Sequence, residues 1–364
     1  MGDQTDIGQA GRTAEQAGTT ELGDQPGKTA RTAPADQPEQ TAPTAPAQQP
    51  EQTAQTARTA YTVPAGALVG VVGAGTMGVG VAQCFAEAGH PVVVVDNDPD
   101  ALASGPAKLR AGIRTAALLR RGARQTRPGA PAPRTETLVT WSAELADMAA
   151  ALLVVECARE DEDVKEGLLR ELDRLCGTET IFASNTSCIP ISRLGSFTDR
   201  PDRVIGTHFM NPAPLKDAVE VIRAPETSGV TVERTKAFLA RVGKHALVVR
   251  DAPGFVTNRV LMLTLNEAAA VLGEGTADAE TVDRIFQDCF GHPMGPLRTA
   301  DLIGLDTIAD SLEVLRRHTG EERFRPCSLL ARLVAEGKVG RKSGSGFYEY
   351  APQHLVARGG TQHG

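Results

Sequence analysis

One histidine and one glutamate have side chains that can transfer a proton, and both lie in apolar runs of the sequence. His208 lies near the end of an apolar run, and Glu220 follows twelve residues later inside a second apolar run, residues 218–222. A carboxylate among apolar neighbours is costly unless it is paired, so His208 is its natural partner. Such a carboxylate orients the imidazole and makes its other nitrogen a better base. The spacing alone equally allows a strand-end histidine and an unrelated edge glutamate.

A glycine-rich turn offers a place for phosphates. Residues 73–78 read Gly-Ala-Gly-Thr-Met-Gly and directly follow the apolar run 67–72. Gly73 permits the tight turn, Gly75 lets the backbone approach a pyrophosphate, and Gly78 lets the following helix lie close to the strand. The helix N-terminus then presents free N–H groups to the phosphates. A plain turn is the alternative, but the flanking patterns favour a dinucleotide, with Gly73, Gly75, Thr76, Met77 and Gly78 as its contacts.

Asp96 indicates which dinucleotide is bound. It ends the next apolar run, residues 92–95, and lies 23 residues after Gly73. A carboxylate at this place accepts hydrogen bonds from the ribose hydroxyls of NAD and repels the additional phosphate of NADP. The next residues are Asn97 and Asp98, and no arginine directly follows Asp96. We therefore expect the cofactor to be NAD.

The elements that position these residues follow from the hydrophobic pattern. Continuous apolar runs typical of strands buried on both faces occur at 67–72, 92–95, 138–141, 152–155, 181–184 and 204–209. Amphipathic stretches at 77–88, 163–175 and 231–242 lie between them, which predicts an α/β Rossmann-type, doubly wound parallel sheet. After residue 252 the pattern is helical, at 256–272, 278–290, 299–317 and 326–336. A smaller all-α domain is therefore expected to follow the sheet.

The ends of the chain differ from this globular part. Residues 1–62 are rich in Ala, Thr, Gln and Pro and have almost no large apolar side chains. Such a segment cannot bury enough surface to offset its conformational entropy, so we expect a disordered leader. The predicted organisation is a leader at 1–62, an NAD-binding domain at 63–251, a helical domain at 252–350 and a tail at 351–364.

Composition excludes several classes of protein. The 364 residues carry 38 basic and 45 acidic side chains, a net charge of −7, which disfavours nucleic acid as a partner. No apolar run reaches the length of about 18 residues that a membrane helix requires. The six cysteines are scattered, with no metal-ligand spacing, and the N-terminus shows no signal-peptide pattern. We expect no metal site, no membrane partner and a reducing, cytoplasmic location.

Seven motifs in register carry a family resemblance. They are residues 184–187 (Ser-Asn-Thr-Ser), 208–212 (His-Phe-Met-Asn-Pro), 219–222 (Val-Glu-Val-Ile), 253–259 (Pro-Gly-Phe-Val-Thr-Asn-Arg), 291–296 (Gly-His-Pro-Met-Gly-Pro), 304–306 (Gly-Leu-Asp) and 340–348 (Gly-Arg-Lys-Ser-Gly-Ser-Gly-Phe-Tyr). With these motifs the chain resembles the NAD-dependent 3-hydroxyacyl-CoA dehydrogenases of the 3-hydroxybutyryl-CoA dehydrogenase type. The resemblance covers residues 66–350, and it favours the paired interpretation of His208 and Glu220.

The resemblance implies roles for individual residues. His208 takes the proton of the substrate 3-hydroxyl while hydride leaves C3 for the nicotinamide, and Glu220 orients His208 and stabilises its protonated form. Ser187 and Asn258 hydrogen-bond the reacting oxygen or the thioester carbonyl, and Asn211 helps to place the nicotinamide. The further cofactor contacts that the family implies are Glu160, Lys165, Asn185, Ser187, Asn211 and Lys342. Cys188, next to Ser187, is interpreted as a small buried residue rather than a nucleophile.

The substrate is left open by two features. Met210 and Asp217 depart from the residues usual in the family, next to the proposed catalytic pair. In addition, residues 101–135 hold eight basic and no acidic side chains. Family members grip CoA with a helix pair inserted here, and arginines suit phosphates. Contact with the thioester carrier is expected from Lys108, Arg114, Arg120 and Arg121.

Three functional hypotheses follow from these observations. The first is an acyl-CoA substrate. The second is a hydroxyacyl unit, such as a glyceryl thioester, bound to an acyl carrier protein in polyketide extender-unit synthesis, because such carriers are acidic. The third is a non-catalytic structural homologue, since fold alone does not establish activity. The helical domain is expected to form a homodimer, as in the family.

Overall fold

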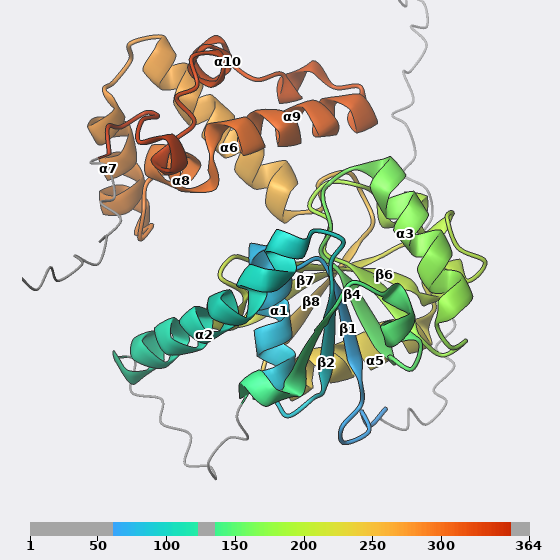
Figure 1. Ribbon diagram of the computed structural model, residues 1–364. Helices are drawn as coiled ribbons and strands as arrows, with labels where there is room; N and C mark the ends of the chain where they lie inside the picture. The colour runs from blue at the N-terminus through green and yellow to red at the C-terminus, as the bar shows by residue number, and fades with distance from the viewer. Residues whose placement is uncertain (1–60, 123–134, 351–364) are drawn as a thin grey trace, which may run out of the picture. The chain divides into compact units, whose positions relative to one another are not determined.

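The computed structural model describes residues 61–122 and 135–350, and the fold is given for these residues. Within them, eight strands form one sheet in the order β3-β2-β1-β4-β5-β6-β7-β8 (Figure 1). The strands are Val69–Val72 (β1), Val92–Val95 (β2), Val139–Ser142 (β3), Leu153–Glu156 (β4), Ile181–Ser184 (β5), Val204–Phe209 (β6), Ala218–Arg223 (β7) and His245–Arg250 (β8). The predicted leader and tail lie outside the described residues, apart from Tyr61 and Thr62.

The first six strands are parallel and agree with the six predicted runs. Strand β1 pairs with β2 on one side and with β4 on the other, so that the turn at residues 73–78 leaves the middle of the sheet. All residues of β1, β2, β4, β5 and β6 are buried. Burial on both faces explains why these strands read as continuous apolar runs.

The last two strands add one antiparallel pair to the predicted parallel sheet, so that the sheet is mostly parallel. Strand β7 pairs antiparallel with β6, and β8 pairs parallel with β7. Only residues 210–217 separate β6 from β7, which is too short for the crossover that a parallel pair needs. A chain that returns directly must run antiparallel. Neither β7 nor β8 was predicted as a strand from the sequence.

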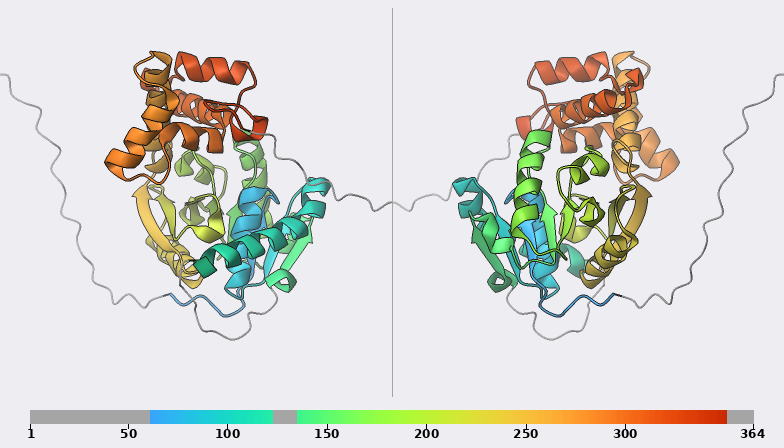
Figure 2. Two further views of the ribbon diagram at one scale, coloured as in Figure 1. Left: turned by 90° about the vertical axis from the view of Figure 1, so that its left-hand side faces the viewer. Right: turned by 90° about the vertical axis from the view of Figure 1, so that its right-hand side faces the viewer.

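Helices cover both faces of the sheet (Figures 1 and 2). They are Thr76–Glu87 (α1), Pro99–Gly122 (α2), Glu162–Leu175 (α3), Ile191–Gly195 (α4) and Gly229–Arg241 (α5). On one face, α1 and α5 bury side chains such as Phe85 and Phe238 against the strands. On the other face, α3 and α4 contribute side chains such as Leu172 and Ile191. After β2 the structure describes one helix, α2, where a helix pair was expected; residues 123–134 lie outside the described part.

The helices after β8 form a core of their own. They are Thr257–Gly273 (α6), Ala279–Phe290 (α7), Pro296–Ile303 (α8), Leu305–Thr319 (α9) and Ser328–Ala335 (α10). The predicted single helix 299–317 is two helices, because Gly304 has φ 110° and cannot continue the first one. In the described part of the chain, no helix has both the length and the apolar character needed to cross a membrane.

His90 was interpreted as one of several surface histidines, and this is wrong. Its side chain is buried at 1% exposure, and its Nδ1 lies 2.9 Å from the carbonyl oxygen of Ala67. The ring packs near Phe85 and Phe238. His90 therefore belongs to the core beside α1 and is unavailable for proton transfer.

Candidate active site

His208 and Glu220 face each other across two neighbouring strands. They are register partners in the antiparallel pair β6–β7, which explains their spacing of twelve residues. The Nδ1 atom of His208 lies 3.1 Å from Oε2 of Glu220, and each residue is only 6% exposed. The structure thus brings together the two groups that the sequence could pair only by argument.

Glu220 is held in its ionised form. Burial acts to raise the pKa of this carboxyl, but the hydrogen bonds from His208 and from the backbone of Val256 and Thr257 outweigh it, so that the pKa is lowered. The backbone nitrogens of Val256 and Thr257 lie 2.8 and 3.2 Å from its Oε1. Because a carboxylate only accepts, Nδ1 of His208 carries the proton, and in the neutral ring Nε2 is free to accept one.

Ser187 lies at that free nitrogen. Its hydroxyl oxygen is 3.3 Å from Nε2 of His208. The loop that carries Ser187 is fastened by Oε1 of Glu160, which accepts hydrogen bonds from the hydroxyl of Thr186 and from the backbone nitrogens of Ser187 and Cys188 at 2.5, 2.8 and 3.0 Å. Glu160 thus supports the position of Ser187 directly.

Asn258 and Asn185 contact the loop and strand that carry Ser187 and His208, and Asn211 lies just beyond the strand. The amide of Asn258 donates to the carbonyl of Ser187 at 3.1 Å and lies 3.5 Å from the sulfur of Cys188. Oδ1 of Asn185 accepts from the backbone of Phe209 at 2.8 Å, next to His208. Asn211 is exposed just beyond the end of β6.

The turn after β1 has the shape that a dinucleotide requires. Gly73 has φ 101°, and a Cβ there would lie 2.7 Å from the carbonyl oxygen of Cys157. A Cβ at Gly78 would lie 1.8 Å from the carbonyl oxygen of Gly73, so only glycine lets α1 approach the strand this closely. Nothing lies within 4 Å of a Cβ at Gly75, and the first turn of α1, with Thr76 and Met77, holds no acidic residue and no side-chain cap. The free amides of this helix start fit a pyrophosphate.

Asp96 stands beside this turn at the end of β2. Its Oδ2 accepts a hydrogen bond from the backbone of Ala74 at 2.6 Å, and Oδ1 accepts one from the backbone of Asp98 at 2.9 Å. The side chain is half-buried. A fixed carboxylate next to the phosphate-binding turn fits the ribose of NAD.

Lys165 is buried in the structure, whereas Lys342 is exposed. Lys165 is 1% exposed, and its ammonium lies 2.7 and 2.8 Å from the two carboxylate oxygens of Glu156. Burial would lower its pKa, but Glu156 and Glu160 outweigh this and raise it. Lys342 is exposed and pairs with Asp306 at 2.6 Å, at the start of α9.

The basic residues of α2 are only partly available. Lys108 and Arg114 are exposed, whereas the guanidinium of Arg120 binds Glu87 at 2.9 Å and the carbonyl of Pro214 at 3.0 Å. Arg120 therefore fastens the loop between β6 and β7. Arg121 is helical, and its side chain lies outside the described part of the structure.

Three residues that complete this region were not predicted from the sequence. Glu156 ends an apolar strand as Asp96 does, and this similarity could have revealed it. Phe255 packs its ring against the imidazole of His208, and Thr257 lies at Glu220, but neither is distinguished by residue type or spacing. Cys188 is buried, as expected, and burial raises the pKa of its thiol to about 11, so it is a poor nucleophile.

A doubly wound sheet with a phosphate-binding turn at β1 and a histidine–carboxylate pair at the end of β6 defines an NAD-dependent dehydrogenase. Residues 68–252 match the family described as "3-hydroxyacyl-CoA dehydrogenase, NAD binding domain", and residues 254–350 match its "C-terminal domain". This chain belongs to the 3-hydroxyacyl-CoA dehydrogenase family.

Individual relatives agree with this membership. The chain is 42% identical over 287 residues to a probable 3-hydroxybutyryl-CoA dehydrogenase of Bacillus subtilis, an alignment that covers 77% of this chain and 96% of the relative. It is 41% identical to a 3-hydroxybutyryl-CoA dehydrogenase of Bradyrhizobium diazoefficiens, covering 78% and 94%. The crystal structure of (S)-3-hydroxybutyryl-CoA dehydrogenase PaaH1 from Ralstonia eutropha matches with a TM-score of 0.70 and 39% identity, covering 78% and 99%.

These relatives also decide between the functional hypotheses. The family membership makes the chain an NAD-dependent oxidoreductase, so the hypothesis of a non-catalytic homologue is wrong. The hypothesis of a carrier-protein substrate in polyketide synthesis finds no support, since the relatives named above are called CoA dehydrogenases. The engagement of Arg120 by Glu87 also weakens the basic patch on which that hypothesis depended.

Proposed function

We propose that this enzyme interconverts 3-hydroxyacyl-CoA and 3-oxoacyl-CoA thioesters, with a short acyl group such as 3-hydroxybutyryl. The observation that carries the proposal is the pairing of His208 with the ionised Glu220, together with Ser187 at the free imidazole nitrogen. The named relatives support the CoA thioester and the short acyl group.

The proton path follows from these distances. Nε2 of His208 takes the proton of the 3-hydroxyl, and Glu220 stabilises the imidazolium that results. Ser187 and Asn258 hydrogen-bond the reacting oxygen or the thioester carbonyl. NAD, when bound, accepts the hydride from C3. The buried setting of the pair excludes water from the proton transfer.

The proposed cofactor contacts form two groups. Gly73, Gly75, Thr76, Met77 and Gly78 hold the pyrophosphate, and Asp96 holds the ribose. Nearer the nicotinamide we propose the residues Glu160, Lys165, Asn185, Ser187, Asn211 and Lys342. Since Lys165 is enclosed by carboxylates, we assign it an indirect role through Glu160, 3.5 Å away.

On the substrate side, we propose that the exposed Lys108 and Arg114 attract the phosphates of CoA. Arg121 remains a predicted contact. For Arg120 we propose a supporting role, because Glu87 and the Pro214 carbonyl occupy its guanidinium.

One assay tests this proposal. Acetoacetyl-CoA and NADH are mixed with the enzyme, and the loss of NADH absorbance is followed. We expect turnover, and we expect His208→Gln to lower it by roughly 10²–10⁴-fold while NADH still binds. Near-full activity of this variant would remove His208 from the mechanism. Absence of turnover with acetoacetyl-CoA and longer 3-oxoacyl-CoA thioesters would reject the proposed substrate class.

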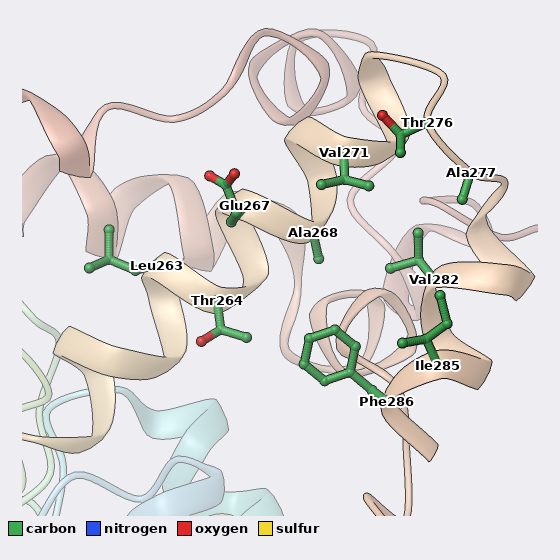
Figure 3. Close-up of a pocket in the computed structure, with 10 residues that line it drawn as sticks. All are labelled: Leu263, Thr264, Glu267, Ala268, Val271, Thr276, Ala277, Val282, Ile285 and Phe286. Atoms are coloured by element: carbon green, nitrogen blue, oxygen red, sulfur yellow. The ribbon is translucent and has the colours of Figure 1, made fainter. Parts of the chain in front are cut away.

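We also propose that the helical domain, divided from the sheet near residue 252, forms the homodimer. The support is an apolar groove of about 520 Å³ between α6 and α7, lined by side chains such as Leu263, Val271, Ile285 and Phe286 (Figure 3). Val260 continues this face of α6 and is 61% exposed. A second copy of the chain would cover this apolar surface.

Sedimentation velocity tests the homodimer. We expect the enzyme to sediment as a dimer and Ile285→Asp as a monomer. Leu118→Asp, at an exposed leucine of α2, is the matched control and should remain dimeric.

Finally, we propose a cytoplasmic location. The support is that the six cysteines are scattered along the sequence, as is typical of free thiols in a reducing compartment. Cell fractionation tests this location.

A further inference from the structure

The segment Pro253–Asn258, which ends in the first residues of α6, has an unusual backbone next to His208 and Glu220. Gly254 has φ 70° and Phe255 has φ 52°. In residues 61–122 and 135–350, Phe255 is the one non-glycine residue with a positive φ. A bulky side chain adopts this conformation only where its surroundings determine it, and such residues cluster at functional sites.

The ring of Phe255 touches the catalytic histidine. It is 3% exposed and lies within the core on the α3–α4 side of the sheet, with side chains such as Ile222 and Ile191. Its centroid is 6.0 Å from that of the His208 imidazole, and the two planes meet at 62°. This is the edge-to-face geometry that aromatic rings favour.

The surrounding chain fixes this ring from both sides. A Cβ at Gly254 would lie 2.3 Å from a methyl carbon of Leu315 in α9, so the turn is pressed against the helical domain. Immediately after Phe255, the amides of Val256 and Thr257 bind Glu220, and Asn258 binds the carbonyl of Ser187. Phe255 therefore stands in the middle of a segment that contacts the His208 ring, the Glu220 carboxylate and the backbone of Ser187.

His208 needs such a restraint. The torsion that turns an imidazole about its Cβ–Cγ bond has broad, roughly two-fold wells, so it is weakly restricted by itself. Glu220 holds Nδ1 at 3.1 Å and the Ser187 hydroxyl lies 3.3 Å from Nε2, and both of these contacts are made at the edge of the ring, where they restrain its plane only weakly. An aromatic neighbour blocks a tilt of this plane and keeps Nε2 directed at Ser187.

We propose that Phe255 is a positioning residue for His208. Its left-handed backbone places the ring against the imidazole and, in the same turn, delivers two amides to Glu220. This inference rests on the proposed function, because it assigns a role in the reaction of that same site.

Phe255→Leu tests the proposal, since it keeps an apolar side chain but removes the ring. We expect kcat with acetoacetyl-CoA to fall by about 10- to 100-fold, as misplacement of a reacting group does, while the Kd for NADH measured by fluorescence is unchanged. In the double variant His208→Gln/Phe255→Leu, turnover should equal that of His208→Gln alone within about twofold, because no imidazole is left to position.

Phe197→Leu is the matched control. Phe197 is buried at 5% exposure in the same core and has its ring under the guanidinium of Arg193, not against His208. This variant should lower the urea midpoint as Phe255→Leu does, yet keep kcat within about twofold of the unmodified enzyme.

The outcomes distinguish a failure of the positioning role of Phe255 from a failure of the proposed function. Equal kcat values for Phe255→Leu and Phe197→Leu would overturn the positioning role, as would a further loss in the double variant. Should Phe255→Leu fail to fold, Phe255→Met, which also lacks the ring, is compared with Phe197→Met by the same criteria. Full activity of His208→Gln would instead refute the proposed function itself.

Discussion

Oε1 of Glu220 lies 2.8 Å from the backbone nitrogen of Val256, so the carboxylate paired with His208 also caps the first helix of the helical domain. One side chain thus joins strand β7, the imidazole of His208 and the start of α6. The positive end of α6 favours a negative charge at this place, in addition to the individual hydrogen bonds. A substitution at Glu220 should therefore affect both turnover and folding.

Glu220→Gln should lower kcat by about 10²-fold, since a neutral amide does not stabilise the imidazolium. It should also change the pH dependence of stability. The folded pKa of Glu220 is lowered below its ordinary 4.5, so its contribution to the free energy of unfolding is present above that value and is lost as the pH falls through the folded pKa. The stability difference from the unmodified enzyme should be constant above about pH 6 and shrink below pH 4.5. Urea titrations across this range measure it; a difference that does not vary with pH would contradict the ionised carboxylate.

Asp96 should determine the choice of cofactor. Its carboxylate stands beside the phosphate-binding turn, and like charges placed together cost several kcal/mol, so kcat/KM should favour NAD over NADP by roughly 10²-fold. Asp96→Asn should reduce this preference to about tenfold or less, mainly by improving the use of NADP. Steady-state kinetics with both cofactors provide the measurement. Equal efficiencies in the unmodified enzyme would refute the assignment.

Five of the six predicted strands were recognised because each is buried on both faces and reads as a largely apolar run, whereas the edge strand β3 is only partly buried. Strands β7 and β8 were harder to recognise. Strand β7 contains Glu220, which interrupts its apolar pattern, and β8 is an edge strand whose Leu247 and Val248 are exposed. Their direction depends on the length of the loop at 210–217, and that argument becomes available only once β7 is known to be a strand.

The candidate site shows the same division. His208, Glu220 and the glycines of the turn were found because their residue types conflict with their surroundings or repeat at a known spacing. Phe255 and the amides of Val256 and Thr257 were not found, because an aromatic residue among apolar ones and a backbone N–H carry no signal in the sequence. Their roles depend on tertiary contacts across 35 residues or more, between Glu220 and the start of α6.

Glu160→Ala distinguishes a supporting role from a cofactor contact. Three donors of the loop at residues 186–188 lose their acceptor, which should lower the free energy of unfolding by about 1–3 kcal/mol and reduce kcat through Ser187. If support of the loop is the main role, the Kd for NADH should change little. A large rise of this Kd with kcat retained would instead identify Glu160 chiefly as a cofactor ligand. Ser187→Ala combined with Glu160→Ala should lower kcat by less than the product of the two single effects.

Lys165→Met tests the buried ion pair beneath the site. It leaves Glu156 as an uncompensated charge at 1% exposure, although Ser184 still donates to its Oε2 at 2.6 Å, so the variant should lose about 3–5 kcal/mol of stability. Neutralising the partner as well, in Glu156→Gln/Lys165→Met, should restore part of this loss because no buried charge is left. The raised pKa of Lys165 means that its contribution is fully present below its ordinary 10.5 and is lost only as the pH rises through the folded value, so the cost should be the same from about pH 6 to 9. Lys236→Met, at an exposed ion pair with Glu233, is the control and should cost less than about 1 kcal/mol. Urea unfolding of the unmodified enzyme and the three variants measures these differences, and equal costs for Lys165→Met and Lys236→Met would show that the buried pair does not stabilise the fold.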